Sequence, residues 1–405
     1  MKNGLRAVFV NHSHPDKKHV SALRLTSFAR VLAARGHKIV LFTETLNPDD
    51  PAPSVTQTQT DLGGHDWTQP FVLPCPPKPA PLLARARVGG LGFGARQCVL
   101  GASYLFRSGV FTDWQEGARR YFPVLDKSFR PQIVWGTFGN TDAWNIARGL
   151  ADLSGCPWIA DVKDNWSAFL PRGFARLIAA RYRDAAHMTV YSEGHRDEAD
   201  RWFSQNKTVI YSGFNEDSRP PIPQEPAQFR ILLTGSIYDD ACLARLIGGI
   251  RDWLPGFAND VVFSYAGNDG ERVKRQAQSL QGLCEIDIRD FLAYDELIAL
   301  QKASSINVYI HNPRSLFQHK TLELLAPGVP VIAIPGESRE AVRIADEMGG
   351  RLLLCDTQDQ VCSALQKISA DARPTVDIDK MNAYSWQAQA GNLTRIFERV
   401  IGGGA

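Results

Sequence analysis

Long uncharged hydrophobic runs are missing from this sequence of 405 residues. No stretch approaches the roughly 18 apolar residues that a membrane-spanning helix needs, so we expect no spanning segment. Residues 1–10 are too few and turn polar too soon to act as a secretory signal peptide. These absences favour a cytoplasmic protein.

Paired cysteines are also missing. The seven cysteines are odd in number and scattered, and none belongs to a Cys-x-x-Cys pair, which argues against a disulfide framework and against a zinc site. No Asp-x-Asp pair follows an expected strand, so neither a metal nor another cofactor is expected. The net charge of +2 argues neither for nor against nucleic acid, and we expect no nucleic-acid partner.

Alternating strands and helices occupy both halves of the chain. The length exceeds that of one ordinary hydrophobic core, and residues 216–227 hold four prolines and three acids, which is typical of a stiff linker. We therefore expect an α/β protein with two doubly wound parallel-sheet domains, 1–215 and 229–383, joined by a linker at 216–228. The predicted strands are 5–10, 38–43, 132–137, 157–161, 207–211, 229–235, 261–266, 285–288, 306–310 and 329–334. The predicted helices include 21–36, 142–154, 241–253, 271–280, 295–302, 320–325 and 384–401.

Two early segments are less regular. Residues 47–81 are rich in Pro, Thr, Gln and Asp, and we expect loops with at most one strand, 69–73. Residues 78–130 hold nine Lys or Arg against three acids, interleaved with large apolar residues. Such a segment can rest on an anionic bilayer surface, or it can form one or two core-packing helices with a solvated basic face.

The stretch 317–334 organises the second half. A helix from Lys320 to Leu325 is ended by Gly328, and a buried strand follows. A carboxylate in the first turn of such a helix lies where open α/β sheets bind ligands. Backbone amides before Lys320 can hold phosphate there, and Glu323 can accept two ribose hydroxyls.

These residues also carry a family resemblance. The pattern Lys320-x-x-Glu323-x-x-Ala326-x-Gly328-x-Pro-Val resembles the nucleotide-sugar motif of GT-B retaining glycosyltransferases of family 4. Residues 29–43 resemble the first helix and second strand of the same enzymes. The resemblance implies two facing Rossmann-like domains, a C-terminal helix (384–405) that crosses back to the first domain, and a Glu323 that binds the donor ribose.

The first domain departs from the family at two places. The family's glycine-rich loop is replaced by one carrying His14, Lys17 and Lys18, which can face phosphate or acceptor. The stretch Asp161-Val-Lys163-Asp164-Asn-Trp resembles the family's Asp-x-Arg-Asp-x-Trp segment. No histidine base is present there, so the catalytic candidates are Asp161 or Asp164 with Lys163; the alternative is a structural pair tied to Lys163.

The donor side departs as well. Gly235 and Ser236 end the first strand of the second domain and permit close approach of a diphosphate. Relatives then supply Arg and Lys, whereas residues 237–240 here are Ile-Tyr-Asp-Asp, so Lys320 becomes the phosphate candidate. The family's first motif Glu falls on Ser315. The donor sugar is then held by Asn312, by Ser315 or by the amides of residues 317–319, His319 included.

The expected function is transfer of a sugar from a nucleoside diphosphate sugar to a saccharide or lipid-linked acceptor, with retention, in cell-envelope or exopolysaccharide synthesis. Lipid-linked acceptors imply contact with the inner membrane through 78–130. A first alternative is a sugar-nucleotide 2-epimerase, for which His12, His14 and Asp161 are the available groups. A second is a non-catalytic nucleotide-sugar-binding subunit of the same fold.

Overall fold

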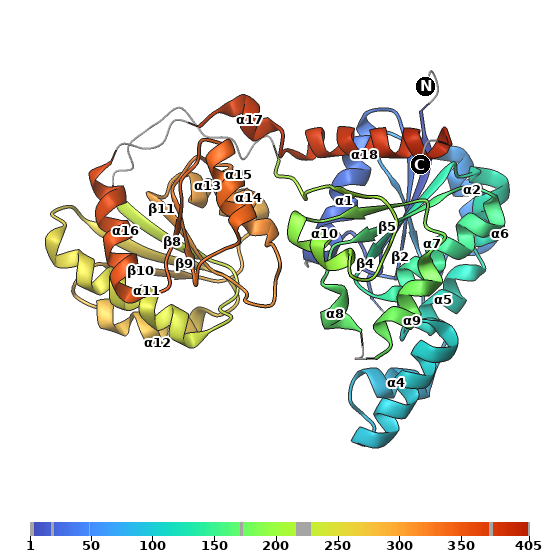
Figure 1. Ribbon diagram of the computed structural model, residues 1–405, viewed down its shortest axis with the longest axis horizontal. Coiled ribbons are helices and arrows are strands. Elements are labelled where there is room, and N and C mark those ends of the chain that lie inside the picture. The colour runs from blue at the N-terminus through green and yellow to red at the C-terminus, as the bar shows by residue number, and fades with distance from the viewer. Residues whose placement is uncertain are drawn as a thin grey trace. The chain divides into compact units, whose positions relative to one another are not determined.

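The computed structural model describes residues 4–17, 20–47, 49–170, 173–215, 228–371 and 376–403. The chain divides into two compact units, each built around its own parallel sheet (Figure 1). Unit 1 contains Met1–Tyr211 and Gln389–Ala405, and unit 2 contains Ser212–Ala388. The predicted linker lies outside the described residues from 216 to 227.

The sheet of unit 1 has the strand order β3-β2-β1-β4-β5-β6-β7, and every pair is parallel over the described residues. Sequence order reverses between β1 and β4, so the carboxyl ends of these two strands flank the switch point of a doubly wound sheet. The strands are β1 (Arg6–Val10), β2 (Lys38–Thr43), β3 (Phe71–Pro74), β4 (Ile133–Phe138), β5 (Trp158–Val162), β6 (His187–Val190) and β7 (Lys207–Val209).

Helices cover both faces of this sheet because its central strands are apolar on both sides. Val8 and Val10 of β1 pack in a cluster with Trp114 of α5 and Trp144 of α7. The helices are α1 (Val20–Ala34), α2 (Val55–Gly64), α3 (Pro81–Arg87), α4 (Phe93–Arg107), α5 (Thr112–Arg119), α6 (Phe122–Val124), α7 (Thr141–Ser154), α8 (Trp166–Phe169), α9 (Ala175–Ala179) and α10 (Glu193–Ala199), with a π-helical turn at Leu125–Phe129 and a 3₁₀ turn at Ala180–Tyr182.

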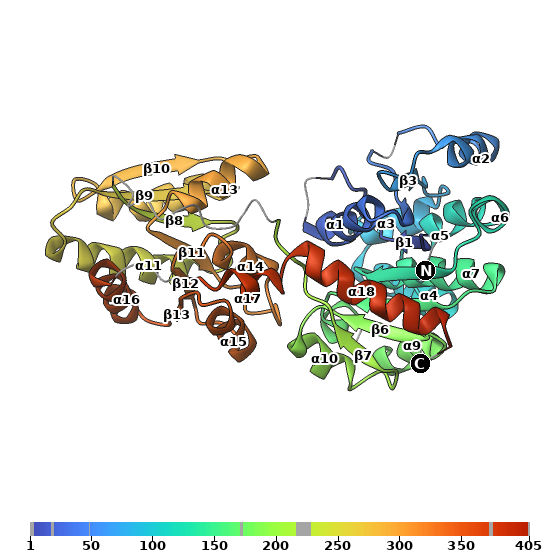
Figure 2. The same ribbon diagram turned by 90° about the horizontal axis from the view of Figure 1, so that it is seen from above.

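The last helix, α18 (Trp386–Ile401), packs on the other face (Figures 1 and 2). Phe397 lies with its ring centroid 6.0 Å from that of Phe9 on β1 and 6.2 Å from that of Trp135 on β4. Phe28 of α1 joins the same aromatic cluster. The predicted return of the C-terminal helix to the first domain is confirmed.

Unit 2 repeats the plan with the strand order β10-β9-β8-β11-β12-β13, again parallel in its described residues. Its switch point lies between β8 and β11. The strands are β8 (Phe229–Thr234), β9 (Val261–Ala266), β10 (Glu285–Arg289), β11 (Ile306–Ile310), β12 (Val331–Ile334) and β13 (Leu352–Leu354). The helices are α11 (Asp240–Trp253), α12 (Gly270–Ala277), α13 (Tyr294–Lys302), α14 (His319–Leu325), α15 (Arg339–Glu347), α16 (Gln358–Ala370) and α17 (Ile378–Asn382).

The stretch that organises the second half folds as its pattern predicts. Helix α14 has Leu322, Leu324 and Leu325 buried, and Gly328 follows it with a φ of 69°. Only glycine adopts this left-handed conformation without strain, and it turns the chain directly into the buried strand β12.

The prediction for residues 47–81 is wrong in one respect, because helix α2 forms there beside strand β3. The Ser54 side chain accepts a hydrogen bond from the Gln57 amide, and Gln57 donates to Asp61 one turn later. Thr58 and Leu62 are the helix residues that are buried. A helix with so short an apolar stripe gives little periodic signal.

The prediction of one or two helices for 78–130 is also too low, since α3, α4, α5 and α6 all lie there. The core-packing alternative holds for α5, in which Trp114 is buried. It does not hold for α4, in which Tyr104 is the buried residue among fifteen.

Candidate functional site

The switch point of unit 2 brings together the carboxyl ends of β8 and β11. Gly235 follows β8 with a φ of 84°, and His311 follows β11. Lys320 reaches this point from α14: a Cβ atom built on Gly235 would lie 3.2 Å from Lys320 Nζ. Glycine is therefore required at 235 both for its backbone conformation and for the space that the lysine occupies.

Lys320 Nζ lies among aromatic rings and carboxylates. It is 5.1 Å from the ring centroid of Tyr309 and 5.5 Å from that of Tyr238. Burial lowers the pKa of Lys320 from 10.5 to about 8, although the charges of Glu337 and Glu323 act in the opposite direction. The ammonium is thus still the main form at neutral pH, held in a weakly solvated position where an anion would bind strongly.

Glu337, which sequence reasoning missed, supplies the buried negative charge beside this lysine. Its side chain is 0% exposed, and it accepts a hydrogen bond of 2.9 Å from the Tyr309 hydroxyl. His311 Nε2 lies 3.3 Å from its other oxygen. The available signal was positional, because Glu337 follows the buried strand β12 at the same sheet edge.

Glu323 and His319 form the rim of the cluster on α14. His319 Nε2 lies 3.1 Å from Glu323 Oε1, and the Glu323 side chain is 20% exposed. Both ring nitrogens of His319 are buried: Nε2 faces Glu323, and Nδ1 has no hydrogen-bond partner among the described residues. A buried imidazole nitrogen without a partner is typical of a site that a ligand completes.

The remaining donor-side candidates build the loop before α14 instead of pointing into the cluster. Asn312 accepts a hydrogen bond from the Arg314 amide, and the Ser315 hydroxyl donates to the Phe317 carbonyl. Ser236 is exposed beside Gly235. Their predicted contacts with the donor sugar stay predictions.

In unit 1, Asp161 at the end of β5 is completely buried and has four hydrogen-bond donors. Arg24 of α1 donates to both carboxylate oxygens, at 3.0 and 2.8 Å, and the hydroxyls of Thr137 and Thr189 each donate at 2.7 Å. This carboxylate ties α1 to strands β4, β5 and β6. The geometry favours the structural alternative over catalysis, but the partner is Arg24, not Lys163 as predicted.

The position of Arg24 in the sequence already indicated a buried ion pair. This arginine precedes Phe28 by four residues on the apolar stripe of α1, and its guanidinium lies 5.3 Å from the Phe28 ring centroid. An arginine on an inward-facing stripe requires a buried acid.

Lys163 and Asp164 lie together beside Gly139, at the end of β4. A Cβ atom on Gly139 would lie 3.6 Å from Lys163 Cε and 3.9 Å from Asp164 Oδ2. Lys163 Nζ donates to the Ser21 carbonyl at 3.4 Å, and burial lowers the pKa of this lysine. Asp164 is half-buried, so its carboxylate, unlike that of Asp161, is within reach of a ligand.

The loop after β1 carries the remaining candidates. Lys17 Nζ lies 3.9 Å from Glu44 Oε2, and His12 Nε2 lies 3.4 Å from the same oxygen. Burial, helped by nearby cations, lowers the pKa of His12 to about 4. Burial raises the pKa of Glu44, although Lys17 acts in the opposite direction. His14 lies apart, 3.7 Å from Asp16, and Lys18 lies outside the described residues. Glu44 was not predicted.

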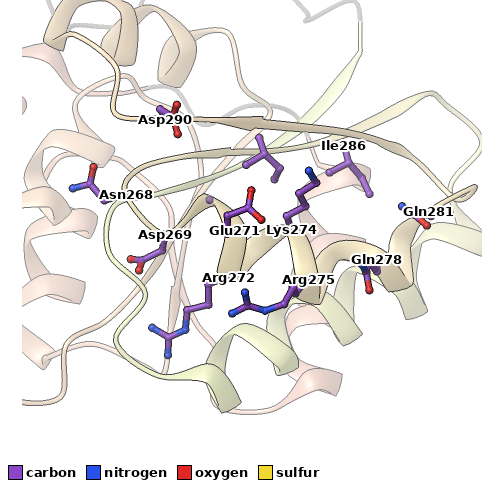
Figure 3. A pocket seen from close by; sticks show the side chains of 12 residues that line it. Asn268, Asp269, Glu271, Arg272, Lys274, Arg275, Gln278, Gln281, Ile286 and Asp290 are labelled. Atoms are coloured by element: carbon purple, nitrogen blue, oxygen red, sulfur yellow. The ribbon is translucent and has the colours of Figure 1, made fainter.

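A surface pocket of about 690 Å³ lies along α12 (Figure 3). Its lining mixes Lys274 and Arg275 with Glu271 and Asp290, so its charge selects neither anions nor cations. It contains none of the predicted donor-binding residues.

The described residues hold neither a candidate metal site nor a candidate membrane span. No group of three His, Cys, Asp or Glu side chains is placed to hold a metal ion. No helix in the described part of the chain is both long and apolar enough to cross a membrane.

Neither a protein-family model nor a curated protein matches this sequence. Solved structures do match. Sucrose-phosphate synthase from Thermosynechococcus elongatus superimposes with a TM-score of 0.68 at 15% identity, over 99% of this chain and 100% of that one. The chain has the GT-B fold.

Two other solved structures share this fold. Anabaena Alr3699/HepE, solved with UDP and glucose, gives a TM-score of 0.58 at 14% identity over 98% of this chain and 99% of that one. A putative UDP-N-acetylglucosamine 2-epimerase from Listeria monocytogenes gives 0.60 at 12% identity over 99% and 97%. At these identities the likeness establishes the fold alone, and both chemistries occur on it.

Proposed function

We propose that this protein is a glycosyltransferase that moves a sugar from a nucleoside diphosphate sugar to a saccharide or lipid-linked acceptor. One observation carries the proposal: Lys320 places a half-buried ammonium against Gly235 at the switch point of unit 2. This is where a doubly wound sheet binds its ligand. The GT-B neighbours include a protein solved with UDP-glucose, which supports a uridine diphosphate sugar as the first donor to try.

Each step of transfer has a group to serve it. Lys320 neutralises the charge that develops on the leaving diphosphate, and Glu337 holds the surrounding side chains in place. Glu323 accepts the ribose hydroxyls, and His319 donates to the donor substrate from Nδ1, which has no hydrogen-bond partner among the described residues. In unit 1, Asp164 and Lys163 serve the acceptor. We propose that the anomeric configuration is retained, that no metal takes part, and that the product belongs to an envelope or extracellular polysaccharide.

The first test concerns Glu323. Glu323→Ala is expected to abolish the rise in Tm that nucleoside diphosphate sugars give the wild-type protein, because the ribose loses its acceptor. The Tm without donor stays within a few degrees, since the residue is on the rim. A thermal-shift and hydrolysis panel over several donors measures both effects.

Glu285→Ala is the matched control, because Glu285 is an exposed acid on β10. An unchanged donor shift in Glu323→Ala would remove the ribose assignment. A donor that binds but never transfers or hydrolyses would instead identify a non-catalytic binding subunit.

The 2-epimerase alternative has one observation in its favour, the pair of His12 and Glu44 at the switch-point edge of unit 1. The low pKa of His12 leaves the imidazole neutral at neutral pH but makes it a weaker base than a free histidine, so the pair favours this alternative only through the closeness of the two side chains. The two functions separate by product, because an epimerase converts the donor without acceptor into its C2 epimer. NMR of the reaction mixture distinguishes that outcome from transfer or hydrolysis.

A further inference from the structure

Helices α3 and α4 form a hairpin, residues 81–107, whose surface the proposed function does not explain. The two helices are joined by Arg96, which donates to the Ala86 carbonyl at 2.9 Å. At its far end α4 is anchored by Arg181, which donates to the Tyr104 carbonyl at 3.2 Å. Figure 1 shows α4 projecting away from the sheet of unit 1.

The exposed face of α4 is apolar, the reverse of an ordinary surface helix. Tyr104 is its one buried residue, and Arg96 faces the packed side. Every exposed residue before Arg107 is uncharged: Phe93, Gly94, Ala95, Gln97, Cys98, Ala102, Leu105 and Phe106.

Large hydrophobic side chains concentrate on this hairpin. Val88 is 84% exposed, Phe93 80% and Phe106 85%, the highest values for large hydrophobic residues in the described chain. Leu82 and Leu105 are exposed as well. Exposed hydrophobic residues scattered singly need no explanation, but a group of five on one projecting element indicates a surface that something covers.

The charge of the hairpin identifies what covers it. Residues 79–112 contain four arginines and no acid. Arg87 is neutralised by Asp113 through two hydrogen bonds. Arg107 lies 3.7 Å from Glu116 in an exposed ion pair, which contributes little, and Arg85 is exposed, so both can still face an anion. A second copy pairing through the same face would bring like charges together. An apolar surface bordered by cations instead complements an anionic lipid surface.

We propose that the α3–α4 hairpin docks on an anionic phospholipid bilayer. Phe93, Phe106 and Val88 enter the boundary between headgroups and acyl chains, and Arg85 and Arg107 face lipid phosphates. Helix α4 has fifteen residues, too few to span a bilayer, so it lies in the plane of the membrane. Docking gives the proposed transferase access to lipid-linked acceptors, but binding to lipid needs neither donor nor acceptor.

Sedimentation with vesicles tests this directly on the full-length protein. We expect binding to phosphatidylcholine vesicles that contain phosphatidylglycerol, weaker binding to phosphatidylcholine alone, and loss of binding in about 0.5 M salt. Phe93→Ser with Phe106→Ser should weaken the partition coefficient by at least ~10-fold. Arg85→Glu with Arg107→Glu should remove the preference for anionic lipid.

Controls of the same chemistry lie elsewhere in unit 1. Leu153→Ser removes an exposed leucine from α7, and Arg30→Glu reverses an exposed charge on α1; neither should change vesicle binding. Equal binding of wild type and the double serine variant would overturn the proposal. A second outcome would also overturn it: light scattering shows that the wild type is a dimer and the double serine variant a monomer, and neither protein binds vesicles. Because no nucleotide sugar is present, these outcomes are independent of the transferase assignment.

Discussion

Lys320 is a charged side chain in a position that burial makes unfavourable for charge. Its ammonium lies near two tyrosine rings and against Gly235, the residue after β8, where the absence of a side chain leaves room for it. Glu337 keeps it protonated at neutral pH against desolvation. Because the ammonium is poorly solvated in the free protein, an anion that binds beside it stabilises the charged form strongly.

The pKa of Lys320 predicts a pH dependence. The ordinary value of 10.5 is lowered to about 8, so the ammonium predominates below pH 8 and is lost as the pH rises through that value. We therefore expect kcat/KM, which reports the free enzyme, to fall above about pH 8. A bound diphosphate raises the pKa again, so kcat itself should fall only at higher pH.

Two variants test whether Lys320 causes this fall in activity above pH 8, the alkaline limb of the pH profile. Lys320→Arg keeps its charge throughout and should move the limb out of the measured range, whereas Lys320→Met should lower kcat by ~10²-fold at every pH. A limb near pH 8 that persists in both variants would belong to another group.

Asp161 and Asp164 are three residues apart and have different surroundings. The carboxylate of Asp161 is enclosed by Arg24 and two threonine hydroxyls, whereas that of Asp164 is half-buried beside Gly139. Both acids follow from the sequence, since a charged cluster leaves the end of a buried strand. Which of them is accessible could not be predicted, because Arg24 on the inward-facing stripe of α1 indicates a buried acid but not which one it meets.

These surroundings predict opposite effects of substitution. Asp161→Asn should lower the free energy of unfolding by about 3 kcal/mol, because it leaves the Arg24 guanidinium buried without a counter-charge. Arg24→Met combined with Asp161→Asn should cost less than the sum of the two single changes. Urea denaturation of the three variants measures the coupling.

Asp164→Asn is the matched comparison, with a change in Tm of at most a few degrees and a lower kcat. If Asp161→Asn instead left stability intact and removed activity, Asp161 would be the catalytic acid after all.

At the scale of elements, the sequence predicts most where apolar spacing is long or continuous. Strands such as Val261–Ala266 and Ile306–Ile310 are buried on both faces, and their ends agree with the prediction. Helix α2 was not predicted because it buries only two residues, which is too few to give a periodic apolar pattern, and it begins at an N-cap, Ser54, within a polar segment. The exposed face of α4 could not be recognised either, since an apolar face toward the core and one toward solvent give the same pattern.

The site shows the same division. Lys320 and Glu323 follow from one local motif, whereas Glu337 joins them only because β11 and β12 pair in the sheet. A sequence motif predicts site residues that are close together in the chain. Site residues that only strand pairing brings together can be identified only from the structure.

At the scale of the whole molecule, the C-terminal segment is part of the first core. Phe397 is completely buried and packs against Phe9 and Trp135, so unit 1 is completed only by residues that follow unit 2 in the sequence. The donor cluster, in contrast, is built entirely within unit 2.

This arrangement predicts that a change in α18 separates stability from donor binding. Phe397→Ala should lower the free energy of unfolding of unit 1 by about 3–5 kcal/mol, through lost burial and the cavity left behind. The donor-dependent stabilisation assigned to unit 2 should persist at temperatures where the variant is folded. Tryptophan fluorescence during urea unfolding mainly follows unit 1, which holds seven of the nine tryptophans, and donor titration follows unit 2. Val400→Ala, at a half-buried position on the same helix, should change neither by much. Trp386, the first residue of α18, belongs to unit 2, and its ring centroid lies 5.7 Å from that of His319. Loss of donor binding in a Phe397→Ala protein whose unit 1 remained stable would show that the donor site also depends on the part of α18 that belongs to unit 1.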